Sequence, residues 1–261
     1  MKHRASARLF LVPLWLLAGW LIRPAAALEL QQQLIAPRVW FVDWNFGGFD
    51  LGQSPLLMLN YNAQYADWHF QLLGGYGEAW ESDPISDDFI RDQGGDPAAR
   101  KRSRAEADRF DVQWQIGRKF SMQGIEDAFN FPVPLGPIYV GLAYHYIEFN
   151  FDSPLGDAEV YYHSPELLLG LSQNLGVPGL YFRGHLTYMA YVRWATESPE
   201  FLGKDEGDTD GLLWDAGLVY QLQGDVPLHL SAGYRALEVA EDGSFEEDDF
   251  KGFYVELGLH W

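Results

Sequence analysis

The stretch KGFYVELGLHW, residues 251–261, ends the sequence on an alternation of large apolar residues with small or polar ones. Successive side chains of an extended strand point to opposite sides, so every second residue of this stretch shares a face. We expect a final strand with one large apolar face, and we expect this strand to pair with another one. The apolar face consists of Phe253, Val255, Leu257, Leu259 and Trp261.

The same period of two recurs along most of the chain. In LMLNYNAQYA, residues 57–66, apolar residues occupy the odd positions and amides most of the even ones. Such alternation predicts strands. Many of the predicted strands exceed ten residues, whereas strands of globular proteins average about five or six, and a tilted strand needs about 9–11 residues to cross a bilayer. We predict ten strands, over residues 37–47, 55–66, 68–81, 106–120, 137–151, 159–174, 179–195, 211–223, 226–239 and 250–261.

The connections between these strands alternate in length. Apart from residues 121–136, the even-numbered connections are tight turns, and the odd-numbered ones tend to be long and charged. A meander closed into a barrel puts its long loops at one end, and belts of aromatic residues mark membrane interfaces. A soluble sandwich would keep its aromatic residues in the middle of the strands. Here they lie at strand ends, with Trp44, Trp80 and Phe253 near the long connections and Trp68 and Trp261 near the tight turns.

The first residues have the order of a secretory signal peptide. MKHRASAR is basic, residues 9–22 are apolar, and Ala25 and Ala27 supply small residues for cleavage. The apolar run is short for a membrane-spanning helix. We therefore assign residues 1–27 to a signal peptide and residues 28–261 to an exported barrel domain.

The composition is acidic and contains no cysteine. The chain has 37 acidic and 18 basic residues, and its formal net charge of −19 at pH 7 argues against nucleic acid as a partner. Without cysteine the exported chain has no disulfides. The histidines show no spacing typical of a transition-metal site, so we predict neither a metal site nor a cofactor. The acidic segments 196–210 and 240–249 have the carboxylates to bind divalent cations weakly.

In its alternating strands, loop lengths and aromatic ends the sequence resembles bacterial outer-membrane β-barrel proteins. The resemblance implies an all-β fold, a transmembrane antiparallel up-and-down barrel of about ten strands, with eight as the alternative. It implies a place in the bacterial outer membrane among lipid and lipopolysaccharide, with both chain termini in the periplasm. The ending FYVELGLHW matches the signal that the barrel-assembly machinery recognises during insertion, with Trp in place of the more usual Phe.

The polar faces of the predicted strands carry charges of both signs, which we expect to meet inside the barrel. Barrels of about eight strands are filled by side chains, and open porins need about 16–18 strands. Ten strands are close to the filled limit, so we predict a largely plugged lumen, with a narrow polar conduit as the alternative. The predicted charge network consists of Asp43, Arg109, Asp111, Glu166, Arg183, Arg193, Asp215, Arg235 and Glu256, with Lys119 near one end.

The sequence YYHSPEL contains residue types of a hydrolase triad, His163, Ser164 and Glu166. Neighbouring residues of a strand point to opposite faces, so His163 reaches Ser164 only if a bulge turns one of them. Asp208 and Asp210 supply one half of the paired motifs of outer-membrane aspartyl proteases, and the other half is absent. The main hypothesis is therefore a structural or surface-interaction barrel. The alternatives are a narrow channel for small or hydrophobic solutes and a hydrolase of lipid A or peptides sited at the rim.

Overall fold

A computed structural model describes residues 32–46, 49–80, 98, 106–122, 135–153, 156–198, 203–222, 227–240 and 248–261. The predicted signal peptide and most of the predicted loop 240–249 lie outside these ranges. The described residues form ten strands. These are β1 (Gln32–Phe46), β2 (Phe49–Tyr65), β3 (Trp68–Trp80), β4 (Glu106–Phe120), β5 (Ile138–Ser153), β6 (Gly156–Asn174), β7 (Leu180–Ser198), β8 (Gly203–Gln221), β9 (Leu228–Val239) and β10 (Asp248–His260).

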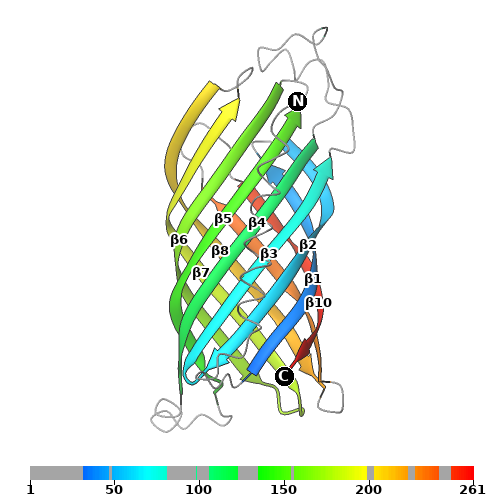
Figure 1. The fold of residues 1–261 in the computed structure, drawn as a ribbon, viewed down its shortest axis with the longest axis vertical. Helices are drawn as coiled ribbons and strands as arrows, with labels where there is room; N and C mark the ends of the chain where they lie inside the picture. The colour runs from blue at the N-terminus through cyan, green and yellow to red at the C-terminus, as the bar shows by residue number, and fades with distance from the viewer. Residues whose placement is uncertain are drawn as a thin grey trace, which may run out of the picture.

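The strands close into one antiparallel barrel, in which each strand pairs with its neighbours in sequence and β10 pairs with β1 (Figure 1). The prediction of an all-β, up-and-down barrel with ten strands is confirmed, and the alternative of eight strands is wrong. Next to the β1–β10 ladder, Gln33 and Trp261 exchange backbone hydrogen bonds of 2.8 and 3.0 Å. The last strand therefore has a partner on both edges, as its apolar face led us to expect.

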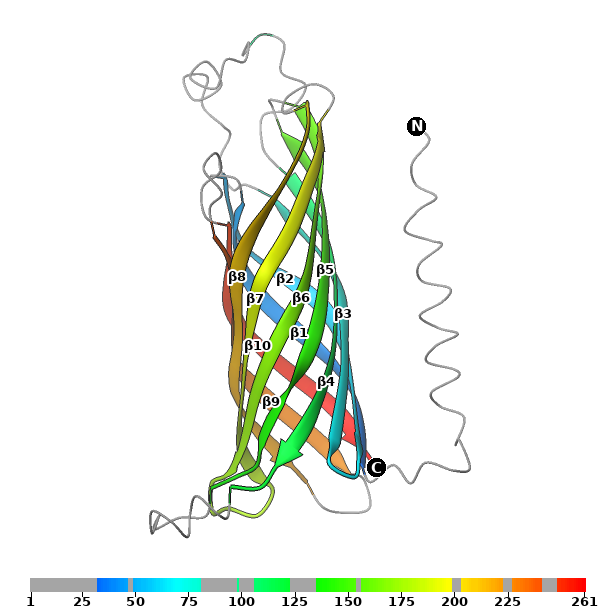
Figure 2. The same cartoon turned by 90° about the vertical axis from the view of Figure 1, so that its left-hand side faces the viewer.

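The strands extend further than predicted toward the long connections. β2 begins at Phe49 and β8 at Gly203, six and eight residues before their predicted starts. We call the end of the barrel with these connections the loop end, and the opposite end, where β1 begins and β10 finishes, the terminal end. β6, β7 and β8 have 19 residues each, whereas β9 has 12 and β10 has 13, so one wall of the barrel is taller (Figure 2). Among the described residues, no helix is long and apolar enough to span a membrane.

The outside of the barrel is apolar. The five residues of the predicted apolar face on β10 are all exposed, from 48 % for Leu259 to 66 % for Phe253. Near the loop end, the rings of Trp214, Tyr234 and Phe253 contact one another across β8, β9 and β10, with centroids 5.3 and 5.1 Å apart. Exposed aromatic residues at the terminal end complete a second belt, formed by Trp68, Phe120, Tyr220 and Trp261.

The inside of the barrel has three levels along its axis. Toward the loop end, apolar side chains from all ten strands pack together, Trp40, Trp44, Phe149 and Phe250 among them. We call this level the aromatic layer. Trp44 was expected in the outer belt, and this prediction is wrong, because β1 turns its even-numbered residues inward from Leu34 to Trp44. Buried charged and amide side chains form the middle level, the ionic layer, and a cavity occupies the terminal end.

An irregularity in β7 changes the direction of side chains within that strand. In β7, Met189 pairs with Gly211 and Val192 with Thr209, so two residues of β7 oppose one of β8. This is the pattern of a β-bulge, and it moves every later side chain of the strand to the opposite face. Met189 and Val192 are both buried in the lumen, although three positions separate them.

Candidate functional site

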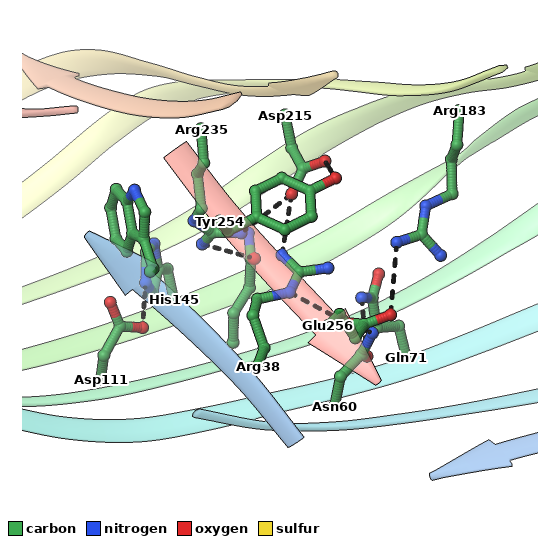
Figure 3. A network of polar contacts seen from close by, with 12 residues as sticks. Arg38, Asn60, Gln71, Asp111, His145, Arg183, Asp215, Arg235, Tyr254 and Glu256 are labelled. Atoms are coloured by element: carbon green, nitrogen blue, oxygen red, sulfur yellow. Dashed lines mark hydrogen bonds and ion pairs between the residues drawn. The ribbon is translucent and has the colours of Figure 1, made fainter. Parts of the chain in front are cut away.

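Arg38 of β1 is the centre of the ionic layer. Its Nη1 donates to Oδ2 of Asp215 and its Nε to Oε2 of Glu256, both at 2.9 Å (Figure 3). All three side chains are at least 96 % buried. A buried charge is costly unless it is paired and hydrogen-bonded, and each of these charges meets that condition. The pairs also join β1 to β8, which is not its neighbour in the barrel.

The carboxylate of Glu256 collects further donors from β2 and β9. Oε2 accepts a hydrogen bond of 2.7 Å from the amide of Asn60, and Oε1 lies 2.8 Å from Nε2 of His229. The carbonyl oxygen of Asn60 in turn accepts from Asn62 and Gln71, at 2.8 and 2.9 Å. Amide side chains thus extend the ionic layer across β2 and β3 without adding charge.

A second group of polar residues continues the layer over β4, β5 and β6. Asp111 accepts from Nη2 of Arg109 at 2.5 Å and lies 2.7 Å from Nε2 of His145. The other ring nitrogen of His145 lies 3.4 Å from Glu166. Gln113 joins the two groups, because it donates to Glu166 at 2.9 Å and accepts from Arg235 at 3.2 Å. Arg235 also lies 4.0 Å from Asp215, so the ionic layer is continuous around the lumen.

Tyr254 of β10 supports Arg38 from the side. Its ring centroid lies 4.1 Å from Cζ of Arg38, a cation–π contact, and its hydroxyl donates to Asp215 at 2.9 Å. The phenol lies over Gly217 and Gly233, which pair across β8 and β9. A Cβ added at either glycine would lie 2.6 Å from the Tyr254 hydroxyl. These two positions therefore need glycine to leave room for the ring.

Arg109 lies where the ionic layer meets the aromatic layer. Its side chain is fully buried, and its Cζ lies 4.7, 5.3 and 5.4 Å from the rings of Phe250, Trp40 and Phe149. The Nε and Nη1 atoms have no hydrogen-bond acceptor among the described residues. The surrounding π faces give these atoms an electrostatic partner, since N–H groups and cations are attracted to aromatic rings.

Seven of the nine residues predicted for the charge network face the lumen. Two predictions are wrong. Asp43 is exposed on the outside of β1, on the same face as Phe41, and Arg193 is exposed on the outside of β7, beyond the bulge. The seven that face the lumen are Arg109, Asp111, Glu166, Arg183, Asp215, Arg235 and Glu256.

Arg38 and His145 belong to the network but were not predicted. β1 is apolar on both faces around Arg38, so the choice of its inner face depended on Asp43, which has the opposite parity. His145 alternates with Ala143 and Ile147 on the inner face, while Tyr144 and Tyr146 lie on the outer face. Neither strand has the contrast between faces that the prediction required. The one available signal was the cost of turning an arginine toward lipid in the middle of a strand.

The predicted hydrolase residues do not come together. His163 lies on the outside, with Nδ1 3.1 Å from the hydroxyl of Tyr144. Ser164 is buried inside, and its hydroxyl donates to the carbonyl of Pro165. The prediction that neighbouring His163 and Ser164 point to opposite faces is confirmed. Asp208 and Asp210 lie on the outward face of β8. Among the described residues, no group of three or more His, Cys, Asp or Glu side chains is arranged to hold a metal ion.

The barrel is closed, its outer surface is apolar, and its interior is polar and aromatic. In hydrocarbon every backbone polar group must be paired within the protein, and a closed barrel meets this demand because it has no free edge. Apolar residues outward and polar residues inward, framed by two aromatic belts, are the arrangement of bacterial outer-membrane barrels. The chain therefore has the architecture of a transmembrane β-barrel.

No protein-family model matches the chain, and no curated protein matches its sequence significantly. Among solved structures, the translocator domain of the autotransporter NalP from Neisseria meningitidis is similar to this chain. The alignment covers 98 % of this chain and 95 % of that domain, with 11 % identity and a TM-score of 0.44. The alignment with the outer-membrane protease OmpT from Escherichia coli covers 90 % of this chain and 97 % of the protease, with 9 % identity and a TM-score of 0.39.

The toluene transporter TodX from Pseudomonas putida is also similar. The alignment covers 92 % of this chain and 73 % of TodX, with 10 % identity and a TM-score of 0.31. Likenesses at these identities and TM-scores assign no activity to the chain.

Proposed function

We propose that this protein is a closed outer-membrane barrel with a structural or surface-interaction role. The observation that supports the proposal is the filling of its lumen by two successive layers, one aromatic and one ionic. Interior filling is expected for barrels of about eight strands and lost in porins of about 16–18 strands. The ten-stranded barrel is closer in size to the small barrels whose interiors are filled by side chains.

Each layer opposes permeation for its own physical reason. In the aromatic layer, Phe149 and Phe250 stack with centroids 5.1 Å apart, and Trp44 packs edge-on against both rings. In the ionic layer, moving Arg38 away from Asp215 and Glu256 would break two buried ion pairs, and breaking a buried ion pair costs about 3–5 kcal/mol. A conducting path would need both layers to move at once.

The taller wall supports a role at the cell surface. The ladder between β8 and β9 ends where Gly211 pairs with Val239, whereas β8 continues to Gly203, paired with Ser198 of β7. Barrels of this class keep short turns in the periplasm and longer loops outside the cell. In that orientation the upper part of the β7–β8 hairpin extends beyond β9, on the taller wall that it forms with β6, and is available to other molecules.

Single-channel recording of the purified chain in planar bilayers tests the closed lumen. We expect no stepwise conductance from the natural protein, and none from Phe253→Ala, which removes an outward-facing ring. The double substitution Arg38→Ala and Trp40→Ala takes one side chain from each layer, so we expect it to gain conductance. Stable openings of the natural protein would overturn the closed-barrel proposal in favour of a narrow channel.

Shortening the projecting hairpin tests the surface role. Residues 196–205 can be replaced by Asn-Gly, a turn suited to two-residue hairpins, because Ala195 and Glu206 form a pair. We expect attachment of expressing cells to immobilised collagen or fibronectin to fall to that of cells without the protein. If attachment and the amount of barrel in the outer membrane were both unchanged, the surface-interaction role would be overturned. Only the structural role would then be left.

A further inference from the structure

A cavity occupies the terminal end of the lumen, below the ionic layer. Its volume is about 360 Å³, within the range of about 300–1,000 Å³ that small-molecule sites have. The side chains around it are mostly polar, and they come from strands on every side of the barrel. Neither the aromatic layer nor the paired carboxylates of the ionic layer fill this space.

The charged side chains that line the cavity are cationic. Lys119 of β4 and Arg183 of β7 line it together with His69, His185 and His229, and no carboxylate lies among the described lining residues. This is unusual in a chain whose formal net charge is −19. The described lumen-facing residues include five lysines and arginines but four carboxylates, and all four carboxylates belong to the ionic layer. Among these described residues, basic side chains therefore outnumber acidic ones by one.

Arg183 has donors that the protein does not use. Its side chain is only 15 % exposed, and its nearest carboxylate is Glu256, 3.9 Å from Nη2 and beyond hydrogen-bond distance. Its buried Nε has no acceptor among the described residues. Glu256 is already occupied by Arg38, Asn60 and His229. A guanidinium this buried and this poorly paired is prepared for an acceptor from outside the chain.

Lys119 supplies a second cation on the same wall. The ladder places Lys119 opposite Tyr139, Tyr139 opposite Gly170, and Gly170 opposite His185, in one row across four strands. A Cβ at Gly170 would lie 2.9 Å from the ring of His185, so glycine keeps this part of the cavity open. Arg183 lies two residues along β7 from His185, on the same inner face. No described carboxylate lies within 4 Å of the Lys119 ammonium.

We propose that this cavity binds a small polar anion through a carboxylate or phosphate group. An arginine fork pairs with the two oxygens of such a group, and a lysine adds a mobile point charge. The amides of Gln64, Asn174 and Gln221 and the hydroxyl of Tyr181 also line the cavity and suit the hydroxyl groups of a sugar or hydroxy acid. The ionic layer closes the cavity from above, so the site is a pocket open at the terminal end.

Titration calorimetry of the purified full chain in neutral detergent at low ionic strength tests the site. The probes are inorganic phosphate and citrate, with glycerol as the uncharged comparison. We expect both anions to bind and glycerol not to. Lys119→Gln and Arg183→Gln should each weaken binding about tenfold or more, because each removes a charge-assisted hydrogen bond to the anion.

The matched control is Arg118→Gln, one residue before Lys119 on β4. Arg118 is exposed on the outside, where its guanidinium lies 5.7 Å from the ring of Phe120, so its loss should leave anion binding unchanged. Lys119 has no described ion pair, so its replacement should leave the barrel folded, which heat-modifiability on gels checks. Binding of neither anion, or equal binding by the natural chain and the two cavity variants, would overturn the proposal. The conductance experiment is independent of this outcome.

Discussion

Arg38 and Asp215 form an ion pair across the lumen, 2.9 Å between Nη1 and Oδ2, although 177 positions separate them in sequence. β1 and β8 are not neighbours, since β10 and β9 lie between them. Backbone ladders alone bind each strand to two others, whereas this pair spans the interior. The ionic layer therefore adds tertiary contacts that closure of the barrel does not supply.

Replacing Arg38 by methionine should be strongly destabilising. Methionine fills much of the volume but leaves Asp215 and Glu256 without their shared cation, and breaking a buried ion pair costs about 3–5 kcal/mol. We expect urea unfolding of the barrel in lipid vesicles, followed by tryptophan fluorescence, to show a loss of that size. Arg118→Met removes an outward-facing arginine and should change the free energy of unfolding by less than about 1 kcal/mol. Equal effects of the two substitutions would contradict the central position of Arg38.

The bulge in β7 can be tested with single cysteines, because the natural chain has none. Val192 is 1 % exposed in the lumen, and its neighbour Arg193 is exposed on the outside. We expect Arg193→Cys to react quickly with a maleimide in detergent and Val192→Cys to react slowly. Without the bulge the order would be reversed, because every residue after Met189 would change faces. Mass spectrometry of the labelled protein gives the ratio of the two rates.

The class of fold could be predicted from the sequence because alternation determines it. From Arg109 to Ile116 in β4, polar and apolar residues alternate, and their burial follows that alternation. In β10 the apolar residues Phe253, Val255, Leu257 and Leu259 likewise alternate with buried ones. The pairing order of the strands and the exposed face of β10 then follow, since an up-and-down barrel leaves few other arrangements. The extra length of β2 and β8 could not be predicted, because charged and glycine-rich residues there have the composition of loops.

The errors in the predicted charge network have two local causes. In β1 both faces are apolar, so the alternation does not distinguish the face of Asp43 from that of Arg38, and only Arg38 points inward. In β7 the predicted alternation runs across Ala190 and Tyr191, where one extra residue reverses the inward face. A bulge depends on how two strands pair, so it cannot be recognised from the alternation of residues within one strand. The predictions held where a charged residue lay in an uninterrupted alternation, as for Asp111 and Glu256.

Alanine in place of Gly233 should disturb the support of Arg38. Its Cβ would lie 2.4 Å from the carbonyl oxygen of Ala216 and 2.6 Å from the hydroxyl of Tyr254. Overpacking of this kind costs about 1–3 kcal/mol, and we expect that loss in the free energy of unfolding. Gly74→Ala is the control, because its nearest contacts would be 3.8 and 3.9 Å. If Tyr254→Phe removed the sensitivity to Gly233→Ala, the hydroxyl would be identified as the colliding atom, and an unchanged penalty would assign the strain to the β8 backbone.

The apolar face of β10 should matter more for assembly in the cell than for stability once folded. We propose that the barrel-assembly machinery recognises Phe253, Val255, Leu257, Leu259 and Trp261. The backbone of Trp261 already exchanges two hydrogen bonds with Gln33, which a side-chain substitution does not remove. Trp261→Asp should therefore reduce the amount of folded barrel in the outer membrane to a small fraction, while the barrel refolded in detergent stays closed. Trp261→Phe keeps an aromatic ring and should assemble normally. Heat-modifiability of membrane fractions and of refolded protein measures both quantities, and normal assembly of the aspartate variant would exclude Trp261 from the signal.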